Sequence, residues 1–431
     1  MKLLVTGLCI SRNLGGPAMA LTLVNELKKR LPQADFLFAI DPNSFRQEKQ
    51  WADYYGFKIV RGDTIVSHMN QKQPVRLAKI VYRFIKKKRP YSTDISNDLK
   101  IHQEFMQAYR ECDAVINMMG ISYVGDGVRG LSEGLISYSN LYYAKKWRKP
   151  FTHFIQSFGP FDDWKVRFFA RKDFDQVDFV PARGEQSAKY CRKIVKHPEK
   201  VFDFPDAAIL LEPAGDEWVL PYLDKQQIAS KSYTILSPSS VIFNMRSTVC
   251  GSIGEEHVKS FYLVAKKLLS EQKTILFLPH MYSENKQECD REICYKVISM
   301  LREDCANVNS YKVVKEDIDV WQAKALIAHA ENAVVSRYHA LVAAISTGVP
   351  VITIGWNIKY YDLMSYYGIE KMSIDTRDNN PEQISNKVYK MLNEYKTNNY
   401  IKIMKNNHNE NVKKVQTAFD ILEKWIKSHV R

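Results

Sequence analysis

The sequence predicts an α/β protein of two Rossmann-like domains, whose parallel sheets face a cleft between them. Its 431 residues fit about two domains of ordinary size. Short apolar runs alternate with segments of helical periodicity, which is the pattern of strands and crossover helices in parallel sheets. The rhythm weakens from Pro205 to Lys231, where prolines and a glycine occur, and then begins again.

The first half of the chain predicts one set of strands and helices. Residues 2–10 form an apolar run that reads as a buried strand, and residues 18–31 repeat apolar side chains at helical spacing. We expect further strands at residues 35–40, 57–61, 114–118, 151–156 and 177–181, and further helices at residues 74–88, 98–112, 131–147 and 184–195. These elements define a first domain over residues 1–205.

The second half repeats the pattern. We expect strands at residues 233–237, 273–279, 332–336 and 350–354, and helices at residues 255–269, 288–301, 318–329 and 338–347. They define a second domain over residues 206–375, followed by a charged helical tail over residues 376–431. Ligands of open parallel sheets bind beyond the carboxyl ends of the strands, so functional side chains should directly follow strands. Two such domains form the GT-B-like architecture, which periodicity alone does not distinguish from other two-domain α/β enzymes.

The charge balance favours anionic partners. The 62 Lys and Arg residues exceed the 48 Asp and Glu residues, for a formal net charge of +14. Phosphorylated metabolites, sugar nucleotides, acidic polysaccharide and anionic lipid all fit this charge. Two basic runs, Lys86–Arg89 and Lys145–Lys149, are either solvated helix ends or contacts to an anionic membrane. No motif that combines aromatic and basic residues indicates nucleic acid, and we expect none as a partner.

Cysteine usage and hydropathy indicate a cytoplasmic setting. The seven cysteines are odd in number and match no zinc spacing, which favours a reducing compartment. No uncharged apolar stretch reaches 18 residues, so no transmembrane helix is expected. We therefore predict a cytoplasmic protein, with peripheral contact at the inner face of the membrane as a further possibility.

Two glycine-bearing loops follow predicted strands in the first domain. Asn13-Leu14-Gly15-Gly16 precedes a helix, and it is either a tight turn or a ligand loop at the helix N-terminus. The loop from Gly120 to Gly127 carries Asp126, and it is either substrate-facing or a plain connector.

Two further polar positions lie close to the predicted domain boundary. Arg183 follows a strand, and its planar guanidinium suits a carboxylate or phosphate. Glu185 and Ser187, just after it, are expected to cap the next helix. Asp206 is a turn residue, a base, or the partner of a nearby arginine.

The segment Ser336-Arg337-Tyr338-His339 is the most specific candidate for an active site. It directly follows an apolar strand and begins a helix. Arg337 would clamp an anion, His339 would donate a proton, and the helix dipole would favour negative charge. Lys359, after the next strand, either joins Arg337 in binding an anion or is an exposed helix lysine.

At these positions the chain resembles the polysaccharide pyruvyl transferases. The resemblance rests on Arg-Gly-Glu-Gln-Ser at residues 183–187, Pro-Asp-Ala at 205–207, Phe-Leu-Pro-His at 277–280, Ser-Arg-Tyr-His-Ala at 336–340 and Gly-Val-Pro at 348–350. It extends to about Ile369. The front loop departs from the family pattern, because many members carry Gly-Asp after the asparagine and this chain has Leu14-Gly15-Gly16.

The resemblance implies transfer of the enolpyruvyl group of phosphoenolpyruvate to a sugar, as a pyruvate ketal, with release of phosphate. The sugar would belong to a cell-surface polysaccharide or its lipid-linked precursor. His339 would then protonate the methylene carbon, and Arg337, Arg183 and Lys359 would bind the donor. Asn13, Gly15, Gly16 and Asp126 would contact the acceptor in the first domain, and the donor would bind the second. The scheme needs no metal or other cofactor.

Two other functions fit the same sequence. One is a GT-B glycosyltransferase that uses a nucleotide sugar. The other is a non-catalytic, membrane-associated scaffold of polysaccharide assembly. The catalytic base is left open between Asp206, Asp126 and another group.

Overall fold

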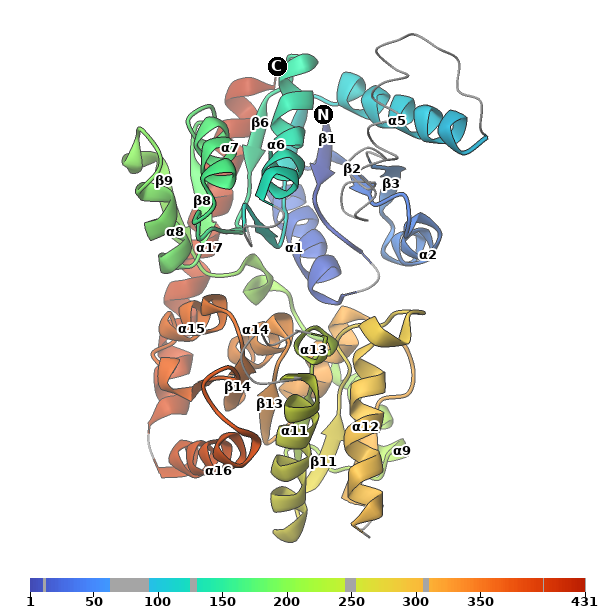
Figure 1. Cartoon of the computed structure of the whole chain (residues 1–431), viewed down its shortest axis with the longest axis vertical. Coiled ribbons are helices and arrows are strands. Elements are labelled where there is room, and N and C mark those ends of the chain that lie inside the picture. The colour runs from blue at the N-terminus through green and yellow to red at the C-terminus, as the bar shows by residue number, and fades with distance from the viewer. Residues whose placement is uncertain are drawn as a thin grey trace. The chain divides into compact units, whose positions relative to one another are not determined.

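A computed structural model describes residues 1–10, 13–62, 93–124, 130–244, 253–304, 310–397 and 399–430 (Figure 1). The predicted helix at residues 74–88, the basic run Lys86–Arg89 and the candidate Asp126 lie outside the described residues. The described chain forms two compact units. Unit 1 contains residues 1–11, 23–204 and 416–431, and unit 2 contains residues 12–22 and 205–415.

Unit 1 is built on a five-stranded parallel sheet in the order β3-β2-β1-β4-β6. Its strands are β1 (Lys2–Thr6), β2 (Asp35–Ile40), β3 (Lys58–Arg61), β4 (Ala114–Asn117) and β6 (Phe151–His153). β1 is central, and Leu3 pairs with Phe36 on one side and Ala114 on the other. Apolar side chains fill β1 and β4 because helices cover both faces of a parallel sheet.

Helices and two small sheets complete unit 1. The helices are α1 (Gly15–Arg30), whose residues 15–22 belong to unit 2, and α2 (Phe45–Tyr55), α5 (Thr93–Glu111), α6 (Gly130–Lys146), α7 (Trp164–Phe174) and α8 (Glu185–Arg192). The additional strand pairs, both parallel, are β5 (Ile121–Ser122) with β7 (Ser157–Phe158), and β8 (Val180–Arg183) with β9 (Val201–Phe204). α6 and α7 lie side by side along one side of unit 1 (Figure 1).

Unit 2 is built on a six-stranded parallel sheet in the order β12-β11-β10-β13-β14-β15. Its strands are β10 (Tyr233–Ser237), β11 (Thr274–Phe277), β12 (Tyr311–Val313), β13 (Asn332–Val335), β14 (Val351–Gly355) and β15 (Ser373–Asp375). β10 and β14 are buried along their whole length. The two sheets confirm the predicted α/β class with parallel strands.

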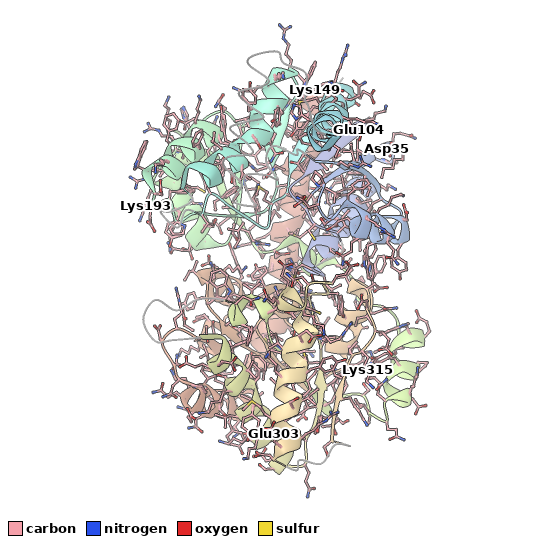
Figure 2. The ribbon with its side chains drawn as sticks, turned by 45° about the vertical axis from the view of Figure 1, so that its right-hand side comes forward. Asp35, Glu104, Lys149, Lys193, Glu303 and Lys315 are labelled. Atoms are coloured by element: carbon pink, nitrogen blue, oxygen red, sulfur yellow. The ribbon has the colours of Figure 1, made fainter. Side chains whose placement is uncertain are left out.

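The helices of unit 2 connect these strands. They are η2 (Ala207–Leu210), α9 (Asp216–Lys225), α10 (Ser240–Phe243), α11 (Ile253–Ser270), α12 (Asp290–Glu303), α13 (Val320–Ala328), α14 (Tyr338–Ser346), α15 (Ile358–Ser365) and α16 (Pro381–Thr397). The last helix, α17 (Tyr400–His429), begins in unit 2 and ends in unit 1. Charged side chains such as Asp35, Lys193 and Lys315 lie on the outside of the units (Figure 2).

The compact units differ from the three predicted segments in that residues 376–415 of the predicted tail belong to unit 2, and at two further places. Residues 12–22 belong to unit 2 although they precede most of unit 1, and residues 416–431 return to unit 1. This return has an apolar cause: Phe419 of α17 is buried against Phe154, with ring centroids 4.8 Å apart. Burial of that face draws the end of the tail into the core of unit 1.

Candidate functional site in unit 2

The segment Ser336–His339 lies where β13 ends and α14 begins. The backbone N–H of Ser336 donates to the carbonyl of Ser237 on β10, at 2.9 Å. The Tyr360 hydroxyl donates to the Ser336 carbonyl at 2.8 Å. Ala340 and Ala344 are fully buried, which lets α14 pack closely. Contacts with β10, with Tyr360 and through the buried face of α14 therefore fix the position of this segment.

Arg337 forms a buried two-point ion pair with Asp290, the first residue of α12. Its Nε lies 2.8 Å from one carboxylate oxygen, and its Nη2 lies 2.6 Å from the other. Nη2 also donates to the Ser240 hydroxyl at 2.9 Å. This fork geometry fixes the guanidinium plane, so Arg337 presents a pre-oriented positive charge at the carboxyl end of the sheet.

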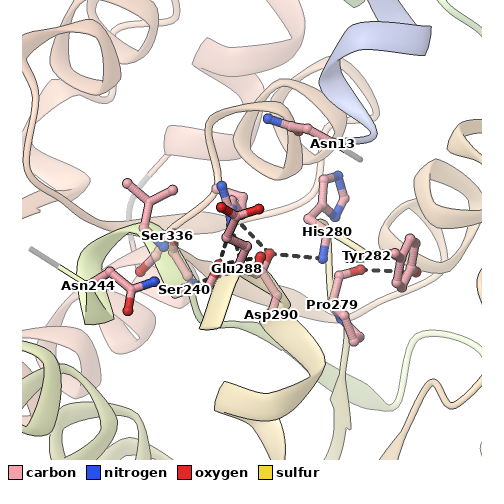
Figure 3. A network of polar contacts seen from close by, with 12 residues as sticks. Asn13, Ser240, Asn244, Pro279, His280, Tyr282, Glu288, Asp290 and Ser336 are labelled. Atoms are coloured by element: carbon pink, nitrogen blue, oxygen red, sulfur yellow. Dashed lines mark hydrogen bonds and ion pairs between the residues drawn. The ribbon is translucent and has the colours of Figure 1, made fainter. Parts of the chain in front are cut away.

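The Asp290 carboxylate is the centre of this polar network (Figure 3). It also accepts the backbone N–H groups of Ser240 at 2.8 Å and His280 at 3.3 Å. It thus joins the segments that follow β10, β11 and β13. Sequence reasoning missed Asp290, and its only signal was an acidic residue at the start of a predicted helix.

His339, the second residue of α14, packs directly against the loop Asn13–Gly16. A Cβ atom on Gly15 would lie 2.0 Å from the His339 Nδ1, so only glycine fits there. The Asn13 side chain accepts the Gly15 N–H at 3.0 Å. The Leu14 N–H donates to the His280 carbonyl at 3.2 Å. The predicted glycine loop therefore approaches His339, within unit 2.

Asp206 faces the other ring nitrogen of His339. Its Oδ2 lies 3.6 Å from the His339 Nε2, and the carboxylate is fully buried. Its Oδ1 accepts the N–H of Ala208 at 2.8 Å and so caps η2. Asp206 is thus a turn residue, which is one of the roles that the sequence left open. Its neighbouring side chain is a histidine rather than an arginine.

A second histidine, His280, lies beside His339. Burial, together with the charges of His339 and Arg337, lowers the pKa of His280 to about 3. His280 is therefore neutral at physiological pH. Its Nδ1 is buried and has no hydrogen-bond partner among the described residues. Two rings with different environments are the usual basis for assigning separate acid–base roles.

Lys324 of α13 brings a further cation to the same place. It is only 5% exposed, and its ammonium donates to the carbonyls of Leu211 and, at 3.5 Å, Ala208. Burial lowers the pKa of Lys324 to about 8, although the carboxylates of Glu212 and Asp206 act to raise it. Sequence reasoning missed this lysine, because a basic residue in a helix is usually solvated.

A small cavity of about 20 Å³ lies between these groups. Its lining includes Lys324, the two histidines His280 and His339, and six apolar residues: Ala18, Ala208, Leu211, Val320, Val342 and Ala343. The space suffices for about one water molecule or one oxygen of a ligand. The cavity therefore marks where a negatively charged oxygen would find positive charge and little competing water.

Lys359 lies in an aromatic environment next to the same segment. Its ammonium is 5.3 Å from the centroid of the Tyr338 ring, 5.5 Å from that of Tyr360 and 5.9 Å from that of Trp356. Cation–π contacts of this kind hold the lysine ammonium in place beside the aromatic rings.

The remaining predicted donor residue, Arg183, belongs to unit 1. Its Nε donates to the Ser157 hydroxyl at 3.1 Å, and its Nη2 donates to the Gly120 carbonyl. The side chain is 3% exposed. These contacts hold the strand end of β7 and the loop at Gly120 together within unit 1.

Unit 1 contains its own pocket of about 280 Å³, at the carboxyl ends of β1 to β4. Its polar lining comes from Thr6, Cys9, Asp41, Ser139 and Asn140, and its apolar lining includes Leu8, Ile40, Phe105, Met119 and Ile136. This is where ligands of open parallel sheets bind.

Unit 2 therefore combines an oriented arginine, a histidine beside a carboxylate, and two lysines at one sheet edge. No group of three His, Cys, Asp or Glu residues suited to a metal occurs in the described part of the chain. Among the described helices, none has the length and apolarity to cross a membrane. Such a site fits acid–base chemistry on an anionic substrate.

Comparisons with known proteins identify the family of the chain. The chain belongs to the polysaccharide pyruvyl transferase family, whose sequence profile matches residues 13–358. It is 22% identical to the amylovoran biosynthesis protein AmsJ of Erwinia amylovora over 298 residues. The aligned region covers 68% of each chain. The protein is thus a transferase that acts on sugars.

Solved structures of similar fold confirm the GT-B-like architecture. One is Anabaena HepE in complex with UDP and glucose, with a TM-score of 0.56, 12% identity, and 99% of this chain and 100% of that chain covered. Another is the UDP-GlcNAc 2-epimerase of Methanocaldococcus jannaschii, with a TM-score of 0.54 and 14% identity. The match covers 91% of this chain and 93% of that chain. At these identities the likeness concerns the fold alone.

Proposed function

We propose that the protein transfers the enolpyruvyl group of phosphoenolpyruvate to a sugar and forms a pyruvate ketal, with release of phosphate. The observation that carries the proposal is the placement of His339 between the Asp206 carboxylate and the Gly15 backbone, beside the oriented Arg337. Family membership supports a pyruvyl transferase, and the charge of the site fits a donor with a carboxylate and a phosphate.

In this scheme, a protonated His339 gives its proton to the methylene carbon of phosphoenolpyruvate, which becomes the methyl group. The adjacent carbon becomes electrophilic, and one sugar hydroxyl adds to it and returns a proton to His339. A second hydroxyl then displaces phosphate, which leaves with the proton of that hydroxyl, and the ketal ring closes. Asp206 stabilises the imidazolium and orients the ring, a role that differs from direct proton transfer.

The donor's negative charges would be met by three cations of unit 2. Arg337 is oriented by Asp290, so its remaining N–H groups can meet a carboxylate. Lys359 and Lys324 would then balance the phosphate. Lys324 joins this set from the structure, whereas the sequence alone assigned Arg183 to the donor. The cell-surface polysaccharide or its lipid-linked precursor remains the proposed acceptor.

The test is a phosphate-release assay with phosphoenolpyruvate and a panel of pyranosides, with ketal formation followed by NMR. His339→Ala should lower kcat by about 10²–10⁴-fold, the usual contribution of a general acid. His197→Ala is the matched control, because His197 is an exposed histidine of unit 1. If His339→Ala retains wild-type turnover, the assignment of the proton donor is wrong.

Two other functions are separated by ligand binding. A glycosyltransferase of the same fold would be stabilised against heat by UDP- or GDP-sugars, and a pyruvyl transferase by phosphoenolpyruvate. A non-catalytic scaffold would respond to neither class of ligand. Stabilisation by a nucleotide sugar alone would overturn the proposed donor.

A further inference from the structure

Helix α7 of unit 1 exposes aromatic side chains on its outer face. Trp164 is 69% exposed and Phe168 is 55% exposed. The two lie one helical turn apart, so they share a face. Lys172 lies one turn beyond Phe168, with its ammonium 6.0 Å from the centroid of that ring. A soluble helix normally turns its aromatic side chains inward, so this face needs an explanation.

The opposite face of α7 is anchored in the core, which fixes the outward direction of these aromatics. Val166, Ala170 and Phe174 are buried. Asp173, also fully buried, accepts a hydrogen bond from the Tyr123 hydroxyl and lies 3.1 Å from the His153 Nε2. Rotation of α7 to bury Trp164 would expose these groups, so the aromatic face belongs to the folded state.

Helix α6 extends the same surface. Tyr142 is 55% exposed, and Tyr138 lies one turn before it. The Tyr138 ring is 5.7 Å from that of Phe169 on α7, and the Lys172 ammonium is 5.6 Å from the Tyr138 centroid. Lys145 of α6 donates to Gln176, just beyond α7. We call this combined surface the α6–α7 face, defined by Tyr138, Tyr142, Lys145, Trp164, Phe168 and Lys172.

The charge of the α6–α7 face is positive. α7 has four basic residues and one acidic residue, Asp173, which is buried. Asp163 caps the helix by accepting the Lys165 N–H at 2.7 Å, and Asp175 lies 3.8 Å from Arg171. Lys145 and Lys146 end α6. The face thus combines exposed indole, phenyl and phenol rings with flexible ammonium groups.

We propose that the α6–α7 face binds the surface of an anionic lipid bilayer. Tryptophan and tyrosine rings favour the boundary between lipid headgroups and acyl chains, and lysines carry their ammonium groups to the headgroup phosphates. Neither kind of residue alone gives stable attachment, whereas the two together do. The bound helix keeps its inner face in unit 1 and offers only its outer face to the membrane.

An acidic polysaccharide is the competing partner, because it too would attract the lysines. It would not favour Phe168, which has no polar group and needs an apolar phase. The exposed phenyl ring therefore distinguishes a bilayer from a soluble polyanion. The proposal does not depend on the proposed reaction, since binding to vesicles needs no turnover.

The experiment is co-sedimentation of the full chain with vesicles of phosphatidylcholine, alone or mixed with phosphatidylglycerol. The protein should bind the mixed vesicles at least about tenfold more tightly than the neutral ones. The double variant Trp164→Ser/Phe168→Ser and the pair Lys145→Glu/Lys172→Glu should each lose about tenfold in affinity for the mixed vesicles. Both variants should keep wild-type turnover on a short soluble glycoside.

Matched controls replace similar residues elsewhere in unit 1. Tyr54→Ser removes an exposed aromatic of α2, and Lys193→Glu reverses an exposed lysine after α8. Both should bind vesicles like the wild type. The proposal is overturned if either α6–α7 variant binds the mixed vesicles as tightly as the wild type. It is also overturned if the wild type binds soluble alginate but not the vesicles.

Discussion

At the scale of single residues, Gly15 determines where the His339 imidazole can lie. Its backbone conformation is one that alanine also adopts, so the only obstacle to a side chain is His339 itself. A methyl group there would overlap the ring at Nδ1, 2.0 Å away. The ring would have to move by about 1 Å or more, and its alignment with Asp206 would be lost.

Gly15→Ala should therefore lower kcat by about a hundredfold while the fold is retained. Gly120→Ala is the control, because a Cβ at Gly120 meets no atom within 4 Å. It should stay within about twofold of the wild type. Turnover of phosphoenolpyruvate and a pyranoside measures both variants. Equal activity of the two would show that His339 does not need its observed position.

The sequence indicates which residues follow strands better than which side chains they contact. Arg337 and His339 are candidate site residues because both follow an apolar strand in one short segment. Asp290 was missed because it lies 47 residues before Arg337, and only the fold brings their side chains together. The sequence predicts either a tight turn or a ligand loop at Asn13–Gly16, and the structure adds His339 as a close neighbour of Gly15.

At the scale of elements, η2 and α13 are connected through Lys324. The Lys324 ammonium binds the carbonyls of Leu211 and Ala208 near the end of η2, whereas Asp206 caps its beginning. The titratable groups near the Lys324 ammonium are Asp206, Glu212 and His408. α13 thus supports the turn that contains Asp206, whose carboxylate lies beside His339.

Turnover at subsaturating phosphoenolpyruvate should fall as pH rises through about 8. Burial lowers the pKa of Lys324 to about 8, so the lysine is protonated below that pH and loses its charge above it. Donor binding would weaken as that charge disappears. Lys324→Met should have a lower kcat/KM and no such alkaline limb, and Lys315→Met, at an exposed lysine, should retain it. An unchanged limb in Lys324→Met would exclude Lys324 as its origin.

Periodicity predicted most elements of the sheets, because buried strands and amphipathic helices have clear patterns. β2 and β10 were predicted with their observed bounds. α9 was missed: it falls in the stretch assigned to the boundary and contains Pro221, which obscures a helical pattern. α7 was also missed, because its exposed aromatics disturb the usual separation of apolar and polar faces.

At the scale of the whole molecule, sequence order did not predict which segments pack together. α1 and α17 each contribute residues to both units, so neither unit is a continuous stretch of chain. A boundary in the sequence shows where the rhythm of strands and helices changes. It does not show that a helix far away will return to cover an earlier core, since that depends on apolar contacts such as Phe154 with Phe419.

The stability of unit 2 should fall in mild acid because it buries two neutral histidines. Burial lowers the pKa values of His257 and His280 to about 3, from 6.5 in an unfolded chain. Below pH 6.5 the unfolded state therefore binds more protons than the folded state. The free energy of unfolding should thus decrease as pH falls from about 6.5 towards 3. By pH 5, each histidine should remove about 2 kcal/mol.

His257→Gln should reduce this acid-induced loss, because it removes one of the two groups and keeps an acceptor for the Ser239 N–H, which His257 Nε2 now accepts at 3.1 Å. Urea unfolding at pH 7 and pH 5 measures the difference. His197→Gln, at an exposed histidine, should lose as much stability between these pH values as the wild type. If His257→Gln does so too, protonation of buried His257 is not what weakens the fold in acid.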